Sequence, residues 1–279
     1  VKCHAAASAL MMGKNVVYIT MEMAEERISE RIDANMMGIR VDEIKDMDKD
    51  TYAKRMERIT SKTTGKLIVK EYPTGSAHAG HFRHLLNELK MKRNFKPDII
   101  MIDYLNICAS SRIKGAAAAN SYTLVKSIAE EIRGLAMEFD CAVITSSQFN
   151  RDGYGNSDVD LTNTSESMGI THTADCILGL ITDEELDSLG QIMIKQLKNR
   201  WGDISWYRRF VVGIDRAKMS IFDLEDSAQS GIQQGQSTAN NTPVKAVTRA
   251  GVDDPIFDKT TFSNPKNGKK SLFGAGGIT

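Results

Sequence analysis

The chain has 279 residues, and its 36 basic side chains are balanced by 36 acidic ones. The length allows one large domain, or one domain with extensions. The zero net charge excludes binding to nucleic acid through a general basic excess, so any DNA contact must come from locally placed charges. Its four scattered cysteines form no Cys-x-x-Cys pair, which argues against a zinc site or a disulfide scaffold and fits a reducing cytoplasm.

Strand and helix signals alternate along residues 1–224. Apolar periodicity predicts helices at 24–37, around 82–89 and from about 120 to 139, and the small residues before position 16 favour another helix. Short apolar runs predict strands at 16–20, 67–70, 98–103, 141–145, 175–181, 192–196, 210–214 and 220–224, with 210–214 expected at an edge. Buried strands that alternate with amphipathic helices indicate an α/β fold, with a mostly parallel sheet covered by helices on both faces.

The composition changes at about residue 225. The segment that follows is rich in Gln, Ser, Asn, Thr and Gly and has no apolar period, which predicts a disordered tail over 225–279 beside a domain over 1–224. Phe257, Phe262 and Phe273 are isolated apolar positions in this tail. Such positions can dock on a partner, although an inert tail is the more common outcome for a chain terminus.

Two carboxylates follow apolar strands, where ligands of parallel sheets bind. Glu22 comes directly after the strand at 16–20, where a general base could polarise a water for attack on a phosphate. The alternative is a glutamate that stabilises a helix start. Asp103 ends the run IIMID, a Walker B pattern in which the carboxylate organises magnesium beside nucleotide phosphates. Many parallel strands end in Asp, so this motif alone is weak.

Two later strands end in polar groups that also suit a nucleotide. Gln148 follows the strand at 141–145, where its amide could sense a γ-phosphate or simply satisfy a loop. Lys198 and Arg200 alternate at the end of a later strand, so the two-residue period places both on one face. Two cations on one face suit an oligophosphate, and a solvated basic edge is the alternative.

The order TMEM, IIMIDY, ITSSQ, SES-MGITHTAD and KQLKNRWGD resembles the RecA-like motor domain of the DnaB family of ring helicases, over about residues 1–224. The segments YITMEMAEE, RIDANM and NSYTLVK are most similar to the branch found in T-even-like phages. The resemblance implies an ATP-dependent replicative DNA helicase. It would translocate as a homo-hexamer on single-stranded DNA in the cytoplasm of an infected bacterium, with a primase and a helicase loader as partners.

The resemblance also implies roles for the four sites. Glu22 would activate water, and Asp103 would hold the magnesium that accompanies ATP. Gln148 would couple the γ-phosphate to the DNA-binding loop. Arg200 would be an arginine finger inserted into the neighbouring subunit's site, with Lys198 assisting, and charge stabilisation of this type contributes about a thousandfold or more in rate.

DNA contacts are expected from two loops that face the channel of the ring. The first, over 110–115, contains Arg112 and Lys114, and the second, over 150–169, contains Arg151, Glu166 and Ser167. Phosphate contacts without base readout suit a translocating motor. Bacterial relatives have Arg before the Glu-Ser pair and Gly after it, whereas this chain has Ser165 and Met168. This departure puts the contacts of the second loop in doubt.

No GxxxxGK[ST] phosphate-binding loop occurs in the chain. In the family, that loop and its strand come directly before the helix that residue 1 begins. We therefore expect the sheet to lack this strand, its neighbours to have unpaired edges, and the isolated fragment to be inactive. Two alternatives stay open: a RecA-like ATPase of another use, such as a recombinase, and an inactive or split subunit that serves as a binding module.

Overall fold

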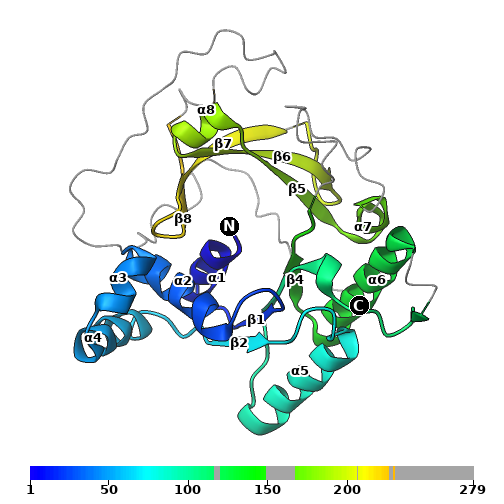
Figure 1. Cartoon of the computed structure of the whole chain (residues 1–279), viewed down its shortest axis with the longest axis horizontal. Coiled ribbons are helices and arrows are strands. Elements are labelled where there is room, and N and C mark those ends of the chain that lie inside the picture. The colour runs from blue at the N-terminus through cyan, green and yellow to red at the C-terminus, as the bar shows by residue number, and fades with distance from the viewer. Residues whose placement is uncertain (116–119, 149–166, 206, 226–228, 230–279) are drawn as a thin grey trace, which may run out of the picture.

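The computed structural model describes residues 1–115, 120–148, 167–205, 207–225 and 229 (Figure 1). Helices and strands alternate along the chain, as the sequence predicts. The elements are α1 (Lys2–Met11), β1 (Val16–Thr20), α2 (Glu25–Met37), α3 (Val41–Asp46), α4 (Lys49–Thr60), β2 (Leu67–Glu71), α5 (Ala79–Arg93), β3 (Ile99–Asp103), the 3-10 turn η1 (Leu105–Ile107), α6 (Ser121–Phe139), β4 (Ala142–Thr145), α7 (Ser167–Thr173), β5 (Cys176–Ile181), α8 (Glu184–Ser188), β6 (Gln191–Asn199), β7 (Arg209–Asp215) and β8 (Ser220–Phe222).

The first four strands form a parallel sheet in the order β2-β1-β3-β4. Each strand is joined to the next along the chain by at least one helix, because parallel neighbours need a long crossover connection. β1 and β3 lie inside the sheet, and all five side chains of β1 are buried. The expected α/β fold with a parallel sheet is therefore confirmed.

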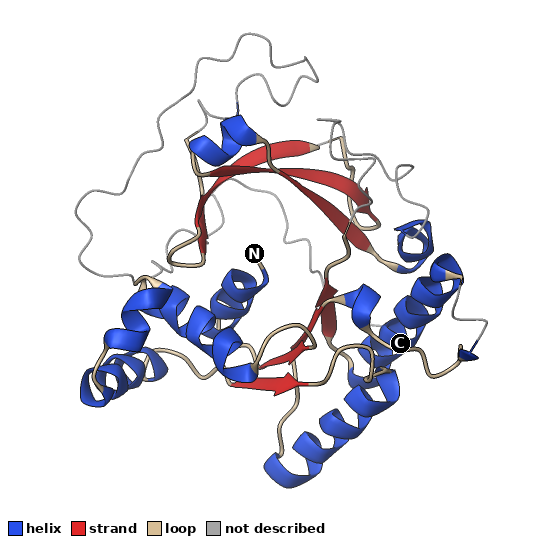
Figure 2. Ribbon diagram, in the orientation of Figure 1, coloured by secondary structure: helices blue, strands red, loops and turns tan. Residues whose placement is uncertain are grey.

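Helices cover both faces of this sheet (Figure 2). Val17 and Ile19 of β1 pack with α5 and α6 in one cluster, whereas Val16 and Tyr18 pack with α1 and α2 in the other. Successive side chains of a strand point to opposite faces, so one continuous apolar run supplies both cores. The small buried residues of α1 allow that helix to lie close to the sheet.

The last four strands form a second sheet in the order β5-β6-β7-β8, and every pairing in it is antiparallel. The alternation of parallel units therefore ends at β4, because short connections such as the one between β7 and β8 join antiparallel neighbours. The expectation that residues 210–214 form an edge strand is wrong. β7 lies between β6 and β8, and its central residues are buried.

β4 and β5 each stand at the end of a sheet. In the described part of the chain, β4 pairs with β3 alone and β5 pairs with β6 alone. Ile144 of β4 is 37% exposed, and Leu178 and Leu180 of β5 are 49% and 43% exposed. The prediction that 141–145 is a buried strand is therefore wrong, because one edge of the strand and part of its apolar surface are open.

α7 packs closely along α6. A Cβ atom on Gly169 would lie 3.0 Å from the Cβ of Lys126, so a larger residue at this position would push the two helices apart. α6 begins at the cap Asn120, whose side chain accepts a hydrogen bond from the Thr123 amide. α6 directly precedes β4 of the parallel sheet, and α7 directly precedes β5 of the antiparallel sheet. The packing of the two helices therefore joins the two sheets (Figure 1).

The expected tail over 225–279 lies almost wholly outside the described residues. Gln229, which is described, donates to the carbonyl of Val211 at 2.7 Å and accepts from its amide at 2.9 Å. The side chain thus satisfies one residue of β7 much as a strand neighbour would. In the described ranges, no helix is both long and apolar enough to cross a membrane.

Candidate functional site

The ends of β1, β3 and β4 meet at one edge of the parallel sheet. Thr20 pairs with Asp103, and Ile102 pairs with Thr145, so all three strands end at the same level. The amide of Met21 also donates to the carbonyl of Asp103 at 3.1 Å. This register brings the residues after the three strands, among them Glu22 and Ser146, to the same edge of the sheet as Asp103.

Within the described ranges, the carboxylate of Asp103 has two side-chain partners, one from α1 and one from β1. The ammonium of Lys2, in the first turn of α1, forms an ion pair with Asp103 Oδ1 and donates to the Ser146 hydroxyl at 2.8 Å. The Tyr18 hydroxyl donates to Asp103 Oδ2 at 3.0 Å. Burial and the nearby carboxylate raise the pKa of Tyr18, which keeps this hydroxyl protonated as a donor.

The atoms around Asp103 suit a magnesium ion. Magnesium prefers oxygen ligands and keeps several waters, so a site with one or two protein oxygens and bound phosphates is typical. Asp103 and Ser146 offer a carboxylate and a hydroxyl, and the Lys2 ammonium that joins them marks a place where positive charge is favourable. The hydroxyl of Ser147 is buried, and it has no hydrogen-bond partner among the described residues.

Glu22 and Gln148 lie at the same edge but on exposed loops. Glu22 occupies the bend between β1 and α2, and Gln148 is the third residue after β4. Neither residue is among the described hydrogen-bond partners of Asp103. An exposed carboxylate beside a strand-end aspartate leaves room for a substrate and a water between the two.

The predicted basic pair lies elsewhere, at the C-terminal end of α7. Lys198 donates to the carbonyl of Thr171, and Arg200 donates to the carbonyl of His172 at 3.0 Å. Arg133 of α6 donates to the next carbonyl, that of Thr173, at 2.8 Å. The last carbonyls of a helix carry partial negative charge, which attracts cations. We call Lys198, Arg200 and Arg133 the basic cluster.

One carboxylate lies within this cluster. Asp175 accepts from Arg133 through Oδ2 and from Arg200 through Oδ1, each at 2.7 Å. The two guanidinium groups hold the pKa of Asp175 below its usual range. Burial and repulsion from Arg200 lower the pKa of Lys198. Among the described residues, the cluster is therefore a crowded set of positive charges around one carboxylate, that of Asp175.

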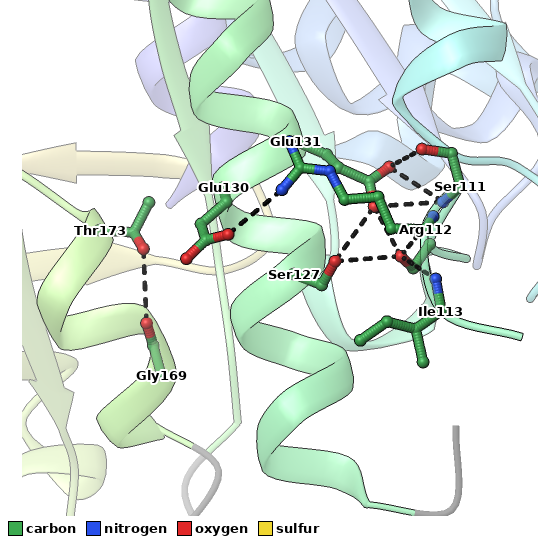
Figure 3. Close-up of polar contacts among 9 residues, drawn as sticks. Ser111, Arg112, Ile113, Ser127, Glu130, Glu131, Gly169 and Thr173 are labelled. Carbon is green, nitrogen blue, oxygen red and sulfur yellow. Dashed lines mark hydrogen bonds and ion pairs between the residues drawn. The ribbon is translucent and has the colours of Figure 1, made fainter. Parts of the chain in front are cut away.

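The first predicted DNA loop is fixed at its base by a buried glutamate (Figure 3). Glu131 of α6 accepts from the hydroxyls of Ser110 and Ser111, at 2.5 and 2.6 Å, and from the Ser111 amide at 3.0 Å. Ser110 in turn accepts from the amides of Arg112 and Ile113, each at 3.1 Å. Burial raises the pKa of Glu131, but these hydrogen bonds outweigh it, so the pKa is lowered overall.

The remaining predicted DNA contacts are placed only in part. Arg112 and Lys114 are exposed, and Arg112 forms an ion pair with Glu130 at 3.3 Å (Figure 3). Arg151 and Glu166 lie outside the described residues. Ser167 begins α7. The first loop is thus supported by α6, through Glu131 at its base and Glu130 beside Arg112.

Sequence reasoning missed several residues that hold these groups in place. Lys2, Glu131 and Arg133 carry no motif signal, and Asp175 ends the motif SES-MGITHTAD without a role that the motif reveals, because their roles depend on contacts between distant segments. The spacing of Ser127 and Glu131, four residues apart on α6, was the available clue, since such pairs face the same side of a helix. That spacing does not show which loop the pair receives.

Known proteins resemble this chain over most of its length. The model of the DnaB-like helicase C terminal domain matches residues 2–210. The DnaB-like replicative helicase of Enterobacteria phage T4 is 43% identical over 261 residues, which are 90% of this chain and 55% of that protein. A probable plasmid replicative DNA helicase of Chlamydia psittaci is 27% identical over 205 residues, which are 70% of this chain and 42% of that protein. The chain spans about half the length of these relatives.

Solved structures agree on the fold. A DnaB-like replicative helicase, studied with its interactions with primase, matches with a TM-score of 0.64 and 19% identity over 80% of this chain and 54% of that one. A second solved structure, an ATPase domain, matches with a TM-score of 0.63 and 18% identity over 80% of this chain and 81% of that one. Together with the family model and the phage relative, these matches lead to one conclusion: the chain belongs to the DnaB-like helicase C-terminal domain family.

Proposed function

We propose that this chain is the ATP-hydrolysing motor of a replicative DNA helicase that moves along single-stranded DNA as a hexameric ring. The observation that carries the proposal is the meeting of three strand ends at one edge of the sheet, where the Lys2 ammonium lies between Asp103 and Ser146. The family match supports helicase function, and its solved relatives include an ATPase domain. ATP and magnesium are the cofactors that this chemistry requires.

The residues of the strand ends have separate tasks in this proposal. Asp103 and Ser146 hold magnesium, which neutralises phosphate charge when bound. Glu22 accepts a proton from the attacking water, and its exposed position leaves space for that water beside the phosphate. Gln148 contacts the γ-phosphate and passes its loss to the loop that follows. Lys198 and Arg200 complete the site of the neighbouring subunit.

A further β-strand, from a segment of the protein outside these 279 residues, would carry the phosphate-binding loop. The open edges of β4 and β5 support this part of the proposal, because exposed apolar residues on an unpaired strand invite pairing. A strand paired there would cover Ile144, Leu178 and Leu180. The isolated chain is then expected to bind ATP weakly.

The first loop contacts DNA phosphates through Arg112 and Lys114, and the second loop adds Arg151, Glu166 and Ser167. The fixed base of the first loop supports this role, because a loop that holds DNA must move together with the domain that hydrolyses ATP. A primase and a helicase loader are the proposed partners, and the proposed location is the cytoplasm of an infected bacterium. The phage relative supports the location, and the primase named for a solved neighbour supports a primase, whereas the loader rests on the family resemblance.

The proposal is tested by mixing two inactive variants of the full-length protein. Arg200→Ala and Asp103→Asn subunits should each hydrolyse ATP at about a thousandth of the normal rate or less. A mixed ring contains interfaces where an intact Asp103 site meets an intact Arg200, so mixing should restore part of the DNA-stimulated ATPase activity. Arg93→Ala, an exposed change on α5, is the matched control and should leave the rate unchanged.

Other outcomes separate the alternatives. Full activity of Arg200→Ala would refute the arginine finger. Two inactive variants that do not complement would refute a site shared between subunits. Strand exchange without unwinding would identify a recombinase-like ATPase. The absence of any ATPase activity in the unmodified full-length protein would favour an inactive subunit that binds partners.

A further inference from the structure

The basic cluster has an unusual geometry at the end of α7. Three consecutive carbonyls, those of Thr171, His172 and Thr173, accept hydrogen bonds from three different basic side chains. These side chains come from two places in the sequence, α6 and the end of β6. The last turn of a seven-residue helix is therefore the common anchor for Lys198, Arg200 and Arg133.

Asp175 holds Arg200 by two independent connections. The Arg200 amide donates to the Asp175 carbonyl at 3.0 Å, and the Arg200 guanidinium donates to the Asp175 carboxylate at 2.7 Å. A free arginine side chain has many rotamers, and fixing it in one orientation costs conformational entropy. The carboxylate and the His172 carbonyl fix the guanidinium from two sides before any neighbour arrives.

Arg133 keeps Asp175 in place. Its guanidinium bridges Asp175 Oδ2 at 2.7 Å and the Thr173 carbonyl, so the carboxylate cannot rotate away from Arg200 without losing a charged partner. The Arg200 side chain nevertheless stays 44% exposed. Its guanidinium is thus held in one orientation and still partly accessible, as a group that works on a second molecule must be.

We propose that Asp175, braced by Arg133, is a positioning residue that orients Arg200 toward the nucleotide of the neighbouring subunit. This inference rests on the proposed function, because it needs Arg200 to act between subunits. The opposite reading is that Asp175 withholds Arg200 until the ring assembles. The two readings differ in sign, since loss of a positioning contact slows hydrolysis and loss of a withholding contact speeds it.

The test uses Asp175→Asn in the full-length protein, because asparagine keeps the shape and removes the charge. Misplacement of a reacting group by about 1 Å can cost about a hundredfold in rate. We expect kcat for DNA-stimulated ATP hydrolysis to fall about tenfold to a hundredfold while KM for ATP changes less than about threefold. Asp175→Glu should recover part of the rate, and Asp46→Asn on α3 is the control.

Complementation separates positioning from general damage. Asp175→Asn should regain activity when mixed with Asp103→Asn. It should not regain activity when mixed with Arg200→Ala, because Asp175→Asn and Arg200→Ala share one defect. A faster Asp175→Asn enzyme would establish withholding and overturn the inference. An unchanged rate would also overturn it.

Two further results keep the inference separate from the proposed function. If Arg200→Ala is fully active, the arginine-finger part of the proposed function fails, whatever the result for Asp175→Asn. If Arg200→Ala is inactive and Asp175→Asn is normal, only the positioning role fails. Should Asp175→Asn not fold, Arg133→Met tests the same point, since it keeps an unbranched side chain but loses the cation whose Nη1 donates to both Asp175 and the Thr173 carbonyl. It should lower kcat in the same direction, and a normal kcat would overturn the inference.

Discussion

Two regions of the molecule position polar groups in different ways. At the strand ends, Asp103 is placed by the backbone ladder of a parallel sheet, with Thr20 as its register partner. Around α6 and α7, Arg200 and the loop at 110–113 are placed by side chains, chiefly Asp175 and Glu131. A sheet fixes the position of a residue whatever its side chain is. A group held by side-chain contacts, which we call tethers, depends on each of those contacts.

This difference leads to different expected effects of mutation. Removing a strand-end group should remove chemistry and leave the fold intact, because its position comes from main-chain hydrogen bonds. Removing a tether should loosen a segment first and affect chemistry through it. Variants at Asp103, Glu131 and Arg112 test this distinction, from the largest expected effect to the smallest.

The largest effect is expected at Asp103. Asp103→Asn should lower magnesium-dependent ATP hydrolysis by the full-length protein about a thousandfold, because the charge that holds the metal is lost. The loss of stability should be small beside this loss of rate, because the ladder that places the residue is intact and only the ion pair with Lys2 and the hydrogen bond from Tyr18 are weakened. Steady-state kinetics and urea unfolding measure the two quantities. A large loss of stability with a modest kinetic defect would place Asp103 with the tethers instead.

Glu131 should show the reverse pattern. Glu131→Ala leaves Ser110 and Ser111 without their acceptor, which should cost about 1–3 kcal/mol of stability. Glu130→Ala is the matched control, because Glu130 is one residue away and, within the described part of the chain, forms an exposed ion pair with Arg112. Urea unfolding should show a clear shift of the midpoint for the first variant and almost none for the second.

The same tether predicts a dependence on pH. The folded pKa of Glu131 is lowered, so its contribution is present above the unfolded pKa of about 4.3 and is lost as the pH falls through the folded value. The free energies of unfolding at about pH 3 and pH 7 should therefore differ less in Glu131→Gln than in the unmodified protein. Equal differences would mean that the carboxylate is not the acceptor that matters.

The smallest effect is expected at Arg112, whose side chain is exposed. Loss of one phosphate contact should reduce the slope of log K against log salt for single-stranded DNA by about 0.7. Arg112→Ala should show this reduction in a fluorescence anisotropy titration, and Lys92→Ala on α5 should not. An unchanged slope would show that Arg112 keeps its partner Glu130 when DNA is present.

Much of the fold was predictable, because buried strands have a period that the sequence shows directly. The run at 16–20 and the run ending at Asp103 are strands as predicted, and their polar successors do lie at one sheet edge. The turn to antiparallel pairing after β4 was not predictable from that pattern. An apolar run such as that of β7 looks the same whether its neighbours are parallel or antiparallel.

The site was predictable only where it follows strand ends. Asp103 and Arg200 have motif signals, but their partners Lys2 and Asp175 lie far away in sequence. Salt bridges of this kind depend on how helices pack, and local sequence does not encode that packing.

Glu131 and Arg133 lie two positions apart on α6, and a helix turns by about 100° per residue. The two side chains therefore leave the helix on nearly opposite sides, one toward the loop at 110–113 and the other toward Asp175. α6 is thus one rigid element that contacts both segments through side chains on opposite sides. A small rotation of α6 about its own axis would therefore move both segments at once, displacing the loop at 110–113 in one direction and Asp175 with Arg200 in the other. A force on one segment would be transmitted through α6 to the other.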